Sequence, residues 1–197
     1  MLAELLLPLS LVMPQQPPKP GDMQYVPERT WSFDYTHLDL GIAGLNNNEN
    51  YGNGAALIGE ASIGIGEHFY LFGLANRSDF EPSANEIVKT YAGGLGFHTP
   101  MNEMSDFQVQ AGFTSIDAKG DAGDVTDDGF TVGFGARFHA MEKTEINALV
   151  SYADLESASI FWRAGVVYEF NKYIAGTIQG QDSEGGSTAL VGMRLSP

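Results

Sequence analysis

Hydrophobic and polar residues alternate with a period of two along most of the chain after residue 30. The clearest run places Phe130, Val132, Phe134, Ala136 and Phe138 on one face and Thr131, Gly133, Gly135, Arg137 and His139 on the other. This period is that of a β-strand with two different faces. The pattern predicts an all-β chain with ten strands, at 30–45, 54–66, 68–77, 86–98, 105–117, 129–140, 143–153, 159–170, 172–181 and 187–195.

The breaks between these strands alternate between long polar segments and short turns. The long ones are 46–53, 77–85, 118–128, 154–158 and 182–186; the shorter ones are Glu67, 99–104, 140–142 and Asn171. In an up-and-down barrel, successive connections fall on opposite rims, and long loops on one rim with tight turns on the other are typical of outer-membrane barrels. We therefore expect a single closed antiparallel up-and-down transmembrane β-barrel of about ten strands, with eight as the alternative.

The decisive question is which face of the closed sheet points outward. The polar face carries nearly balanced isolated charges, which predicts a network inside a narrow lumen made of Glu60, Lys89, Arg137, His139, Glu145, Arg163, Glu169 and Arg194. A soluble barrel of the lipocalin type would reverse the two faces. The directions of Val109, Phe134, Trp162 and Val191 distinguish the two arrangements.

Aromatic residues gather near the predicted strand ends, as in the girdles of membrane barrels. They are Trp31, Phe33, Tyr35, Phe97, Phe107, Phe130, Phe138, Tyr152, Tyr168 and Phe170. Within the first predicted strand, the apolar phase shifts between Tyr35 and Leu38, which a bulge near Thr36–His37 would explain.

Composition narrows the class of partner. The net charge is −15 with ten Lys plus Arg, so the basic footprint of a nucleic-acid-binding protein is missing. The chain contains no cysteine, which excludes disulfides and thiolate metal sites. No segment after residue 20 has the roughly 18 apolar residues of a transmembrane helix, so a membrane-spanning form must be a barrel.

The N-terminal region differs in character from the rest. Leu5 to Met13 is apolar and the right length for the core of a secretory signal, although Glu4 stands where a positive charge is usual. The Pro-rich sequence PQQPPKP follows. We expect residues 1–29 to be a signal-like apolar segment with an extended linker, and 30–197 to be the barrel. The alternative is an apolar segment that stays attached.

Two segments resemble a known family. They are SFDYTHLDLGIAGLNNNENYGNGAALIGEASIGIGEHFYLFGLANRSDF (32–80) and VVYEFNKYIAGTIQGQDSEGGSTALVGMRLSP (166–197). Both are similar to the small outer-membrane β-barrel proteins of Gram-negative bacteria, the opacity and OmpA-barrel-like group. The resemblance implies the bacterial outer membrane as location, its lipid and lipopolysaccharide as partners, and the barrel-assembly machinery during insertion. The last strand departs from the family by ending in Leu195-Ser196-Pro197 instead of an aromatic residue.

Residues that could carry chemistry are few. His37, His68, His98 and His139 have no metal-type spacing, and the chain has no HExxH motif. The acidic segment 117–129 offers Asp121, Asp124, Asp127 and Asp128 as candidate Ca²⁺ ligands, but their spacing is not that of an EF-hand, and a solvated acidic loop is the favoured interpretation. We predict no catalytic residue and no cofactor.

The sequence therefore favours a non-enzymatic, porin-like barrel with a structural or interaction role, a lumen filled by polar side chains and acidic extracellular loops. One alternative is a narrow channel or carrier for small solutes, apolar ones included. Another is an outer-membrane hydrolase, because outer-membrane proteases resemble this chain in strand number and use Asp and Asp–His pairs. Asp117, Asp127, Asp128 and Asp154 with His37 would be the candidates. The His–Ser pair of the lipid A deacylases has no evident counterpart.

Overall fold

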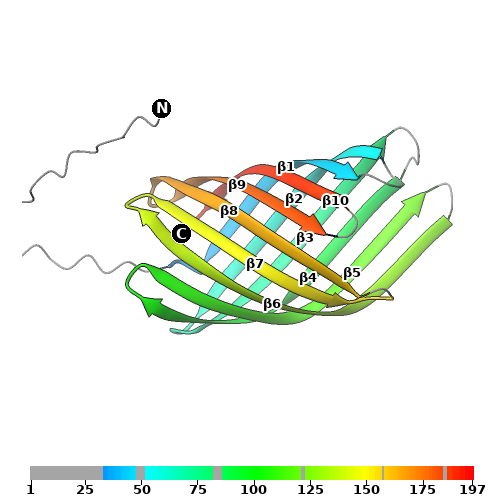
Figure 1. Cartoon of the computed structure of the whole chain (residues 1–197). Helices are drawn as coiled ribbons and strands as arrows, with labels where there is room; N and C mark the ends of the chain where they lie inside the picture. Colours follow the sequence, from blue (N-terminus) through cyan, green and yellow to red (C-terminus); the bar gives the residue numbers. More distant parts are fainter. Residues whose placement is uncertain (1–32, 48–51, 82–85, 121–122, 157, 184–185) are drawn as a thin grey trace, which may run out of the picture. The chain divides into compact units, whose positions relative to one another are not determined.

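A computed structural model describes residues 33–47, 52–81, 86–120, 123–156, 158–183 and 186–197, and residues 1–29 lie outside this described part. The described residues form ten strands (Figure 1): β1 His37–Asn47, β2 Gly52–Ile65, β3 Phe69–Glu81, β4 Glu86–Asn102, β5 Ser105–Gly120, β6 Gly123–Met141, β7 Thr144–Asp154, β8 Ser159–Asn171, β9 Ile174–Ser183 and β10 Gly186–Leu195. No helix that is long and apolar enough to cross a bilayer occurs among the described residues.

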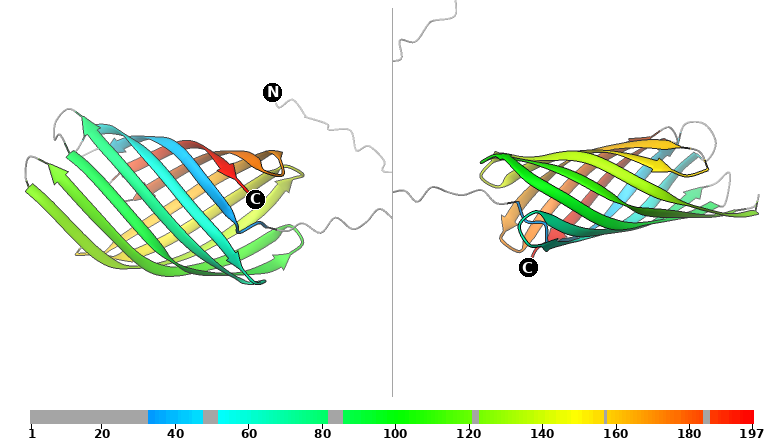
Figure 2. Two further views of the ribbon diagram at one scale, coloured as in Figure 1. Left: turned by 180° about the vertical axis from the view of Figure 1, so that it is seen from behind. Right: turned by 90° about the horizontal axis from the view of Figure 1, so that it is seen from below.

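The ten strands form one closed barrel. Each strand pairs antiparallel with its neighbours in sequence, and the sheet closes where β1 pairs with β10 (Figure 2). At this seam Leu38 lies opposite Leu195 and Ile42 lies opposite Val191. The predicted fold, a closed antiparallel up-and-down barrel of ten strands, is confirmed.

Strand boundaries differ most from the prediction in β1 and in the β5–β6 hairpin, and β3 and β4 also run on to Glu81 and Asn102. β1 begins at His37, so residues 33–36 are not part of the strand and no bulge is needed to explain the shift of phase. The predicted loop 118–128 is mostly strand, because β5 and β6 continue as a paired hairpin in which Asp117 lies opposite Thr126 and Lys119 opposite Asp124. Alternating hydrophobicity could not reveal this extension, since the outward face of the hairpin beyond the barrel wall carries polar residues such as Asp117, Lys119 and Asp124 instead of large apolar ones.

The hydrophobic face of the sheet points outward. Phe134, Trp162 and Val191 are 55%, 52% and 61% exposed, and Val109 is half-buried on the same side. The fully buried side chains are largely polar or charged and face the interior. This is the arrangement of a membrane barrel and the opposite of a lipocalin.

The two ends of the barrel are built differently. We call the end with turns 66–68, 103–104, 142–143 and 172–173 the turn rim, and the end where β1, β3, β5, β7 and β9 finish the loop rim. At the turn rim, Gly66 has a φ of +67°, a conformation that favours glycine. Outward-facing aromatic rings meet nearby, Phe69 with Phe97 at 5.5 Å and Tyr168 with Phe170 at 5.6 Å.

Candidate functional site

A buried ion pair joins neighbouring strands β6 and β7 inside the lumen. Arg137 Nε donates to Glu145 Oε1 at 2.9 Å and Nη2 donates to Oε2 at 2.6 Å, a two-pronged geometry that matches guanidinium to carboxylate. Both residues are only 6% exposed. Because isolated charges are costly to bury, each of these groups compensates the charge of the other inside the barrel.

Two further ion pairs extend the network across the lumen. Arg194 of β10 donates from Nε and Nη2 to the two carboxylate oxygens of Asp39 of β1, both at 2.8 Å. Arg194 Nη1 also lies 3.7 Å from Glu145 Oε1, which connects the first two pairs. Arg163 of β8 donates to Glu60 of β2, so this pair bridges strands that are not neighbours.

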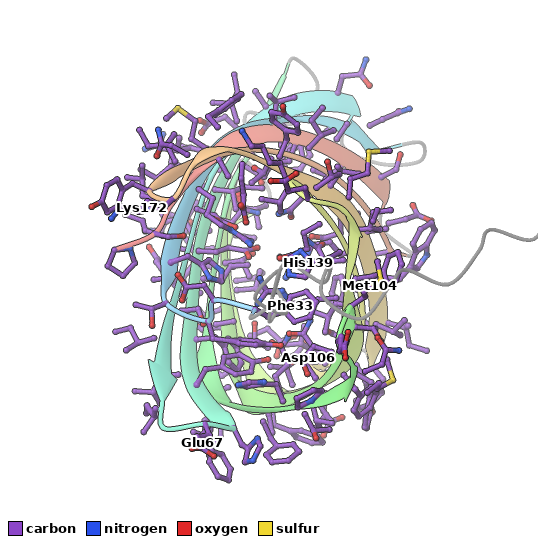
Figure 3. All side chains as sticks on the ribbon, turned by 90° about the vertical axis from the view of Figure 1, so that its left-hand side faces the viewer. Phe33, Glu67, Met104, Asp106, His139 and Lys172 are labelled. Carbon is purple, nitrogen blue, oxygen red and sulfur yellow. The ribbon has the colours of Figure 1, made fainter. Side chains whose placement is uncertain are left out.

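The segment before β1 enters the lumen at the turn rim. Residues 33–36, which we call the plug segment, lie inside the ring of strands: Figure 3 shows Phe33 beside His139 within the barrel, while Glu67, Met104 and Lys172 mark its perimeter. Arg137 Nη1 donates to the carbonyl oxygen of Asp34 at 3.0 Å. The plug segment is therefore attached to the central ion pair by its own backbone.

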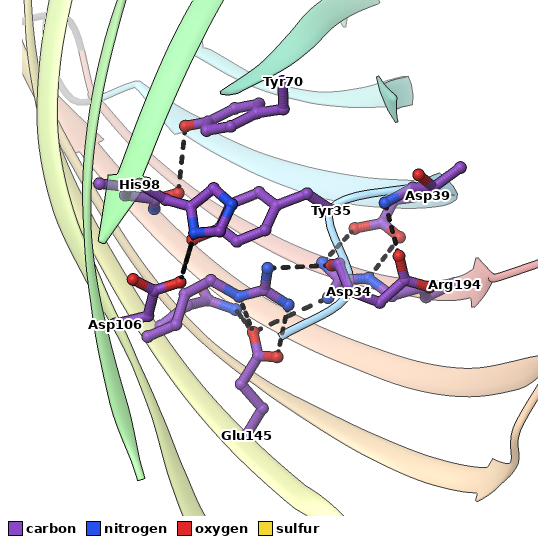
Figure 4. Close-up of polar contacts among 12 residues, drawn as sticks. Asp34, Tyr35, Asp39, Tyr70, His98, Asp106, Glu145 and Arg194 are labelled. Carbon is purple, nitrogen blue, oxygen red and sulfur yellow. Dashed lines mark hydrogen bonds and ion pairs between the residues drawn. The ribbon is translucent and has the colours of Figure 1, made fainter. Parts of the chain in front are cut away.

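Tyr35 is the deepest side chain of the plug segment (Figure 4). Its ring stacks on His98 at 3.9 Å and on Tyr70 at 4.6 Å, and the guanidinium carbon of Arg137 lies 4.6 Å from its centroid. Its hydroxyl donates to Asp106 Oδ2 at 3.0 Å. Burial raises the pKa of Tyr35 well above its ordinary value, so the hydroxyl remains a donor.

Asp106 is the acceptor on which two side chains converge. Besides Tyr35, His98 Nδ1 lies 2.9 Å from Asp106 Oδ2, and Asp106 is 2% exposed. Sequence reasoning missed both Asp106 and Tyr35. Asp106 stands next to the turn at 103–104, where a solvated carboxylate is the ordinary expectation, and the sequence pattern places Tyr35 in the aromatic girdle with Phe33. The girdle prediction is wrong for Phe33 and Tyr35, because the segment before β1 turns into the lumen.

Gly96 makes room for the neighbouring aromatic ring. A Cβ atom at this position would lie 2.0 Å from Cζ of Tyr70, so any side chain here would collide with the ring. Tyr70 in turn donates its hydroxyl to Gln108 Oε1 at 3.2 Å. The glycine on the lumen side of β4 therefore leaves the space that the ring of Tyr70 occupies beside Tyr35.

A cavity of about 280 Å³ lies in the lumen next to this network. Tyr35, Arg137 and Glu145 contribute to its wall on the turn-rim side, and Ile116 and Leu155 lie on the loop-rim side. The lumen is thus divided into a part filled by the plug segment with its ion pairs and a part that remains hollow.

The structure brings together most of the predicted lumen residues. Glu60, Arg137, Glu145, Arg163 and Arg194 form the three ion pairs described above, together with Asp39. His139 is buried at the same end and stacks on Phe33 with centroids 4.3 Å apart.

Lys89 and Glu169 do not belong to this network. Lys89 alternates in β4 with Thr90 and Ala92, which line the cavity, and shares the outward face with the exposed Tyr91. The two consecutive glycines 93 and 94 obscure the alternation in β4, which is why the sequence misplaced this lysine. Glu169 follows the buried Val167 by two positions, so it lies on the same face of β8, but its side chain is exposed at the turn rim.

The acidic candidates for a Ca²⁺ site are spread along the β5–β6 hairpin. Asp127 accepts a hydrogen bond from the backbone of Glu156 at 2.9 Å, and Asp124 lies 3.8 Å from Lys119 Nζ. Asp128 is exposed, and Asp121 lies outside the described residues. Within the described part of the chain, no group of three or more His, Asp or Glu side chains has an arrangement that could hold a metal ion.

All four histidines lie near the turn rim: His37 begins β1, His68 is in the β2–β3 turn, and His98 and His139 are near the turn-rim ends of β4 and β6. Asp117, Asp127 and Asp154 lie at the loop rim, at the opposite ends of their strands. The Asp–His arrangement considered for a hydrolase is therefore not formed by these residues.

Comparison with known proteins identifies the fold of the chain but no family to which it belongs. No protein-family model matches the chain, and no curated protein matches it. The NanC porin is 8% identical, with a TM-score of 0.52 over 80% of this chain and 100% of that one. The translocator domain of the autotransporter NalP from Neisseria meningitidis is 11% identical, with a TM-score of 0.50 over 84% of this chain and 90% of that one. The chain therefore has the fold of small outer-membrane β-barrels.

Proposed function

We propose that this chain is a non-enzymatic outer-membrane β-barrel with a structural or interaction role, whose lumen is blocked at the turn rim by its own plug segment. The outward apolar face supports a location in lipid. The closed barrel supports the same location, because it satisfies the hydrogen bonds of every strand internally. Bacterial outer-membrane lipid and lipopolysaccharide are the proposed surroundings, with the barrel-assembly machinery as the partner during insertion.

The observation that carries the proposal is the position of Tyr35. It fills the lumen between Tyr70, His98 and Arg137, and its hydroxyl is bonded to Asp106. An open general pore needs a continuous water path along the axis. Here the turn-rim end of that path is occupied by a buried ring and by the ion pair that holds Asp34.

Planar-bilayer conductance tests the blocked lumen. The wild-type barrel is expected to show no steady conductance, whereas the double variant Phe33→Ala with Tyr35→Ala is expected to conduct, because both aromatic rings of the plug segment are removed from the lumen. Phe134→Ala with Phe138→Ala, on the outward face, is the matched control and is expected to stay closed. Equal steady conductance of wild type and double variant would refute the proposal.

Location and orientation need a separate experiment. The proposed orientation exposes the loop rim, with Asp124 and Asp128, to the cell exterior. Because the chain lacks cysteine, Asp124→Cys and Glu67→Cys are single labelling sites on opposite rims. A membrane-impermeant maleimide applied to intact cells is expected to label only Asp124→Cys. Labelling of Glu67→Cys alone would reverse the orientation, and a soluble, unmodified fraction with no heat-modifiable band on a gel would contradict the membrane location.

A further inference from the structure

The hollow part of the lumen has apolar side walls and a polar end at the turn rim. We call this polar end, next to the plug segment, the floor of the cavity. Its lining includes Ile58, Leu149 and Leu190, and Leu190 packs with the buried Ala43 and Ala56. These apolar side chains face the lumen and not the lipid, although the other buried side chains of the barrel are largely polar or charged. Apolar side chains facing a hollow space lose contacts that an occupant would restore.

The charges around the cavity are mutually neutralised. Arg137, Arg163 and Arg194 all line it, and each is paired with a carboxylate. A charged ligand would lose its hydration on entry, and the described residues that line the cavity offer no unpaired opposite charge to compensate for that loss. The lining therefore favours a neutral occupant over an ionic one.

Hydrogen-bonding groups remain available near the floor. The hydroxyl of Ser62 and Nδ1 of His37 are buried and have no hydrogen-bond partner within the described structure, and both residues line the cavity. Gln110 and Gln181 add amide donors and acceptors to the wall. Because a buried polar group without a partner is destabilising, a ligand hydroxyl or carbonyl in this position would remove that penalty.

The volume sets the size of the occupant. About 280 Å³ is close to the lower end of small-molecule sites, which are roughly 300–1,000 Å³. It corresponds to about nine waters at ~30 Å³ each. A molecule of similar size with a short alkyl chain would contact the apolar wall while its polar end reaches the floor.

We infer that this cavity is a binding site for a small neutral molecule with an apolar body and one hydroxyl or carbonyl group. The polar end would lie at Ser62 and His37, and the apolar body would lie against Leu149 and Leu190. This inference rests on the blocked lumen of the proposed function, since the plug segment forms the floor. It does not require that the ligand cross the barrel.

Octan-1-ol is the probe, with octanoate and octylammonium as charged analogues of the same length. The methyl-labelled barrel in nanodiscs of deuterated lipid is expected to show saturable intermolecular NOEs from octan-1-ol to Leu149 and Leu190. The charged analogues are expected to bind at least about tenfold more weakly. NOEs confined to outward methyl groups such as Val191 and Ile178, equal binding of all three probes, or a cavity holding only water would each overturn the inference.

Two substitutions at adjacent positions of β7 provide the matched control. Leu149→Trp fills the cavity and is expected to abolish the lumen NOEs, whereas Val150→Trp points outward and is expected to leave them unchanged. Ser62→Ala is expected to weaken octan-1-ol binding by about fivefold, the effect of one hydrogen bond. Heat-modifiable migration establishes that each variant is folded. Loss of NOEs equally in Leu149→Trp and Val150→Trp would contradict the lumen site.

The two proposals fail in different ways. If the wild type does not conduct and octan-1-ol shows no lumen NOEs, the binding site is wrong and the blocked barrel stands. If the wild type conducts steadily, the blocked lumen is wrong, and the floor on which the binding site depends is lost with it.

Discussion

Tyr35 presents the face of its ring to the guanidinium group of Arg137, 4.6 Å away, in the interior of the barrel. The two residues come from the segment before the first strand and from the middle of the chain. Arg137 is at the same time the donor to Glu145 and to the backbone of Asp34. One arginine thus connects the barrel wall to the plug segment, by a cation–π contact and by hydrogen bonds.

Removing the hydroxyl of Tyr35 should destabilise the barrel. Tyr35→Phe takes away one of the two side-chain donors to the buried Asp106, so we expect the free energy of unfolding to fall by about 1–2 kcal/mol. Urea unfolding in lipid vesicles, followed by tryptophan fluorescence, measures this. Tyr152→Phe is the control with an expected change near zero, because its hydroxyl bonds to Asp154 on the exposed surface. Equal effects of the two variants would contradict the role of Tyr35.

The central ion pair should behave as a unit. Arg137→Leu leaves Glu145 buried without its main partner, and we expect a loss of about 3–5 kcal/mol in the free energy of unfolding. The double variant Arg137→Leu with Glu145→Leu should recover most of that loss, because no lone charge remains. Glu169→Leu should change the same quantity by less than about 0.5 kcal/mol, since Glu169 is exposed. Additive effects of the two lumen substitutions would show that they do not interact.

The space at Gly96 can be tested by adding one methyl group. Gly96→Ala brings a Cβ atom into the ring of Tyr70 and should cost about 1–3 kcal/mol of unfolding free energy. Gly180→Ala is the matched control on β9, where nothing lies within 4 Å of the added atom, and it should be nearly neutral. Combining Gly96→Ala with Tyr70→Ala should remove the clash, and a failure to do so would mean that the cost has another origin.

A charge on the outward face distinguishes lipid from water as its surroundings. Val191 is exposed and lies between Ile42 and Ile178 at the middle of the wall, so Val191→Arg should cost about 2–4 kcal/mol in a bilayer. Val125→Arg, on the hairpin at the loop rim, should cost at most about 1 kcal/mol. Equal, small costs for both in vesicles would indicate that Val191 does not face hydrocarbon.

The wall of the barrel could be predicted from sequence, because the alternation of side chains directly reports the two environments of each strand. The run Phe130–Phe138 illustrates this: its large apolar residues face outward, and Arg137 faces the lumen. The pairing of Arg137 with Glu145 was not predictable as a specific contact. It depends on register, and only the charge balance of the interior indicated that such pairs should exist.

The position of the plug segment inside the lumen could not be predicted from the alternation of hydrophobic and polar residues. Tyr35 lies just before the start of β1 and reads as part of an aromatic strand, and its contacts with His98 and Asp106 join residues that are remote in sequence. The strand extension through Asp117 and Asp124 was missed for a different reason. Beyond the barrel wall the outward face of this hairpin is polar, so its sequence is that of a loop until the pairing is known.

The seam between β1 and β10 has a consequence for how the chain assembles. This pairing joins the two strands that are farthest apart in sequence. Its formation therefore has the largest entropic cost of loop closure, and we expect it to form late. Until then, β1 and β10 each present an unpaired edge that can recruit a strand from another chain. Arg137 of β6 binds the backbone just before β1, and this contact limits the positions that the first strand can take before it pairs with the last. When the contact is lost, we expect more oligomers to form before the barrel closes.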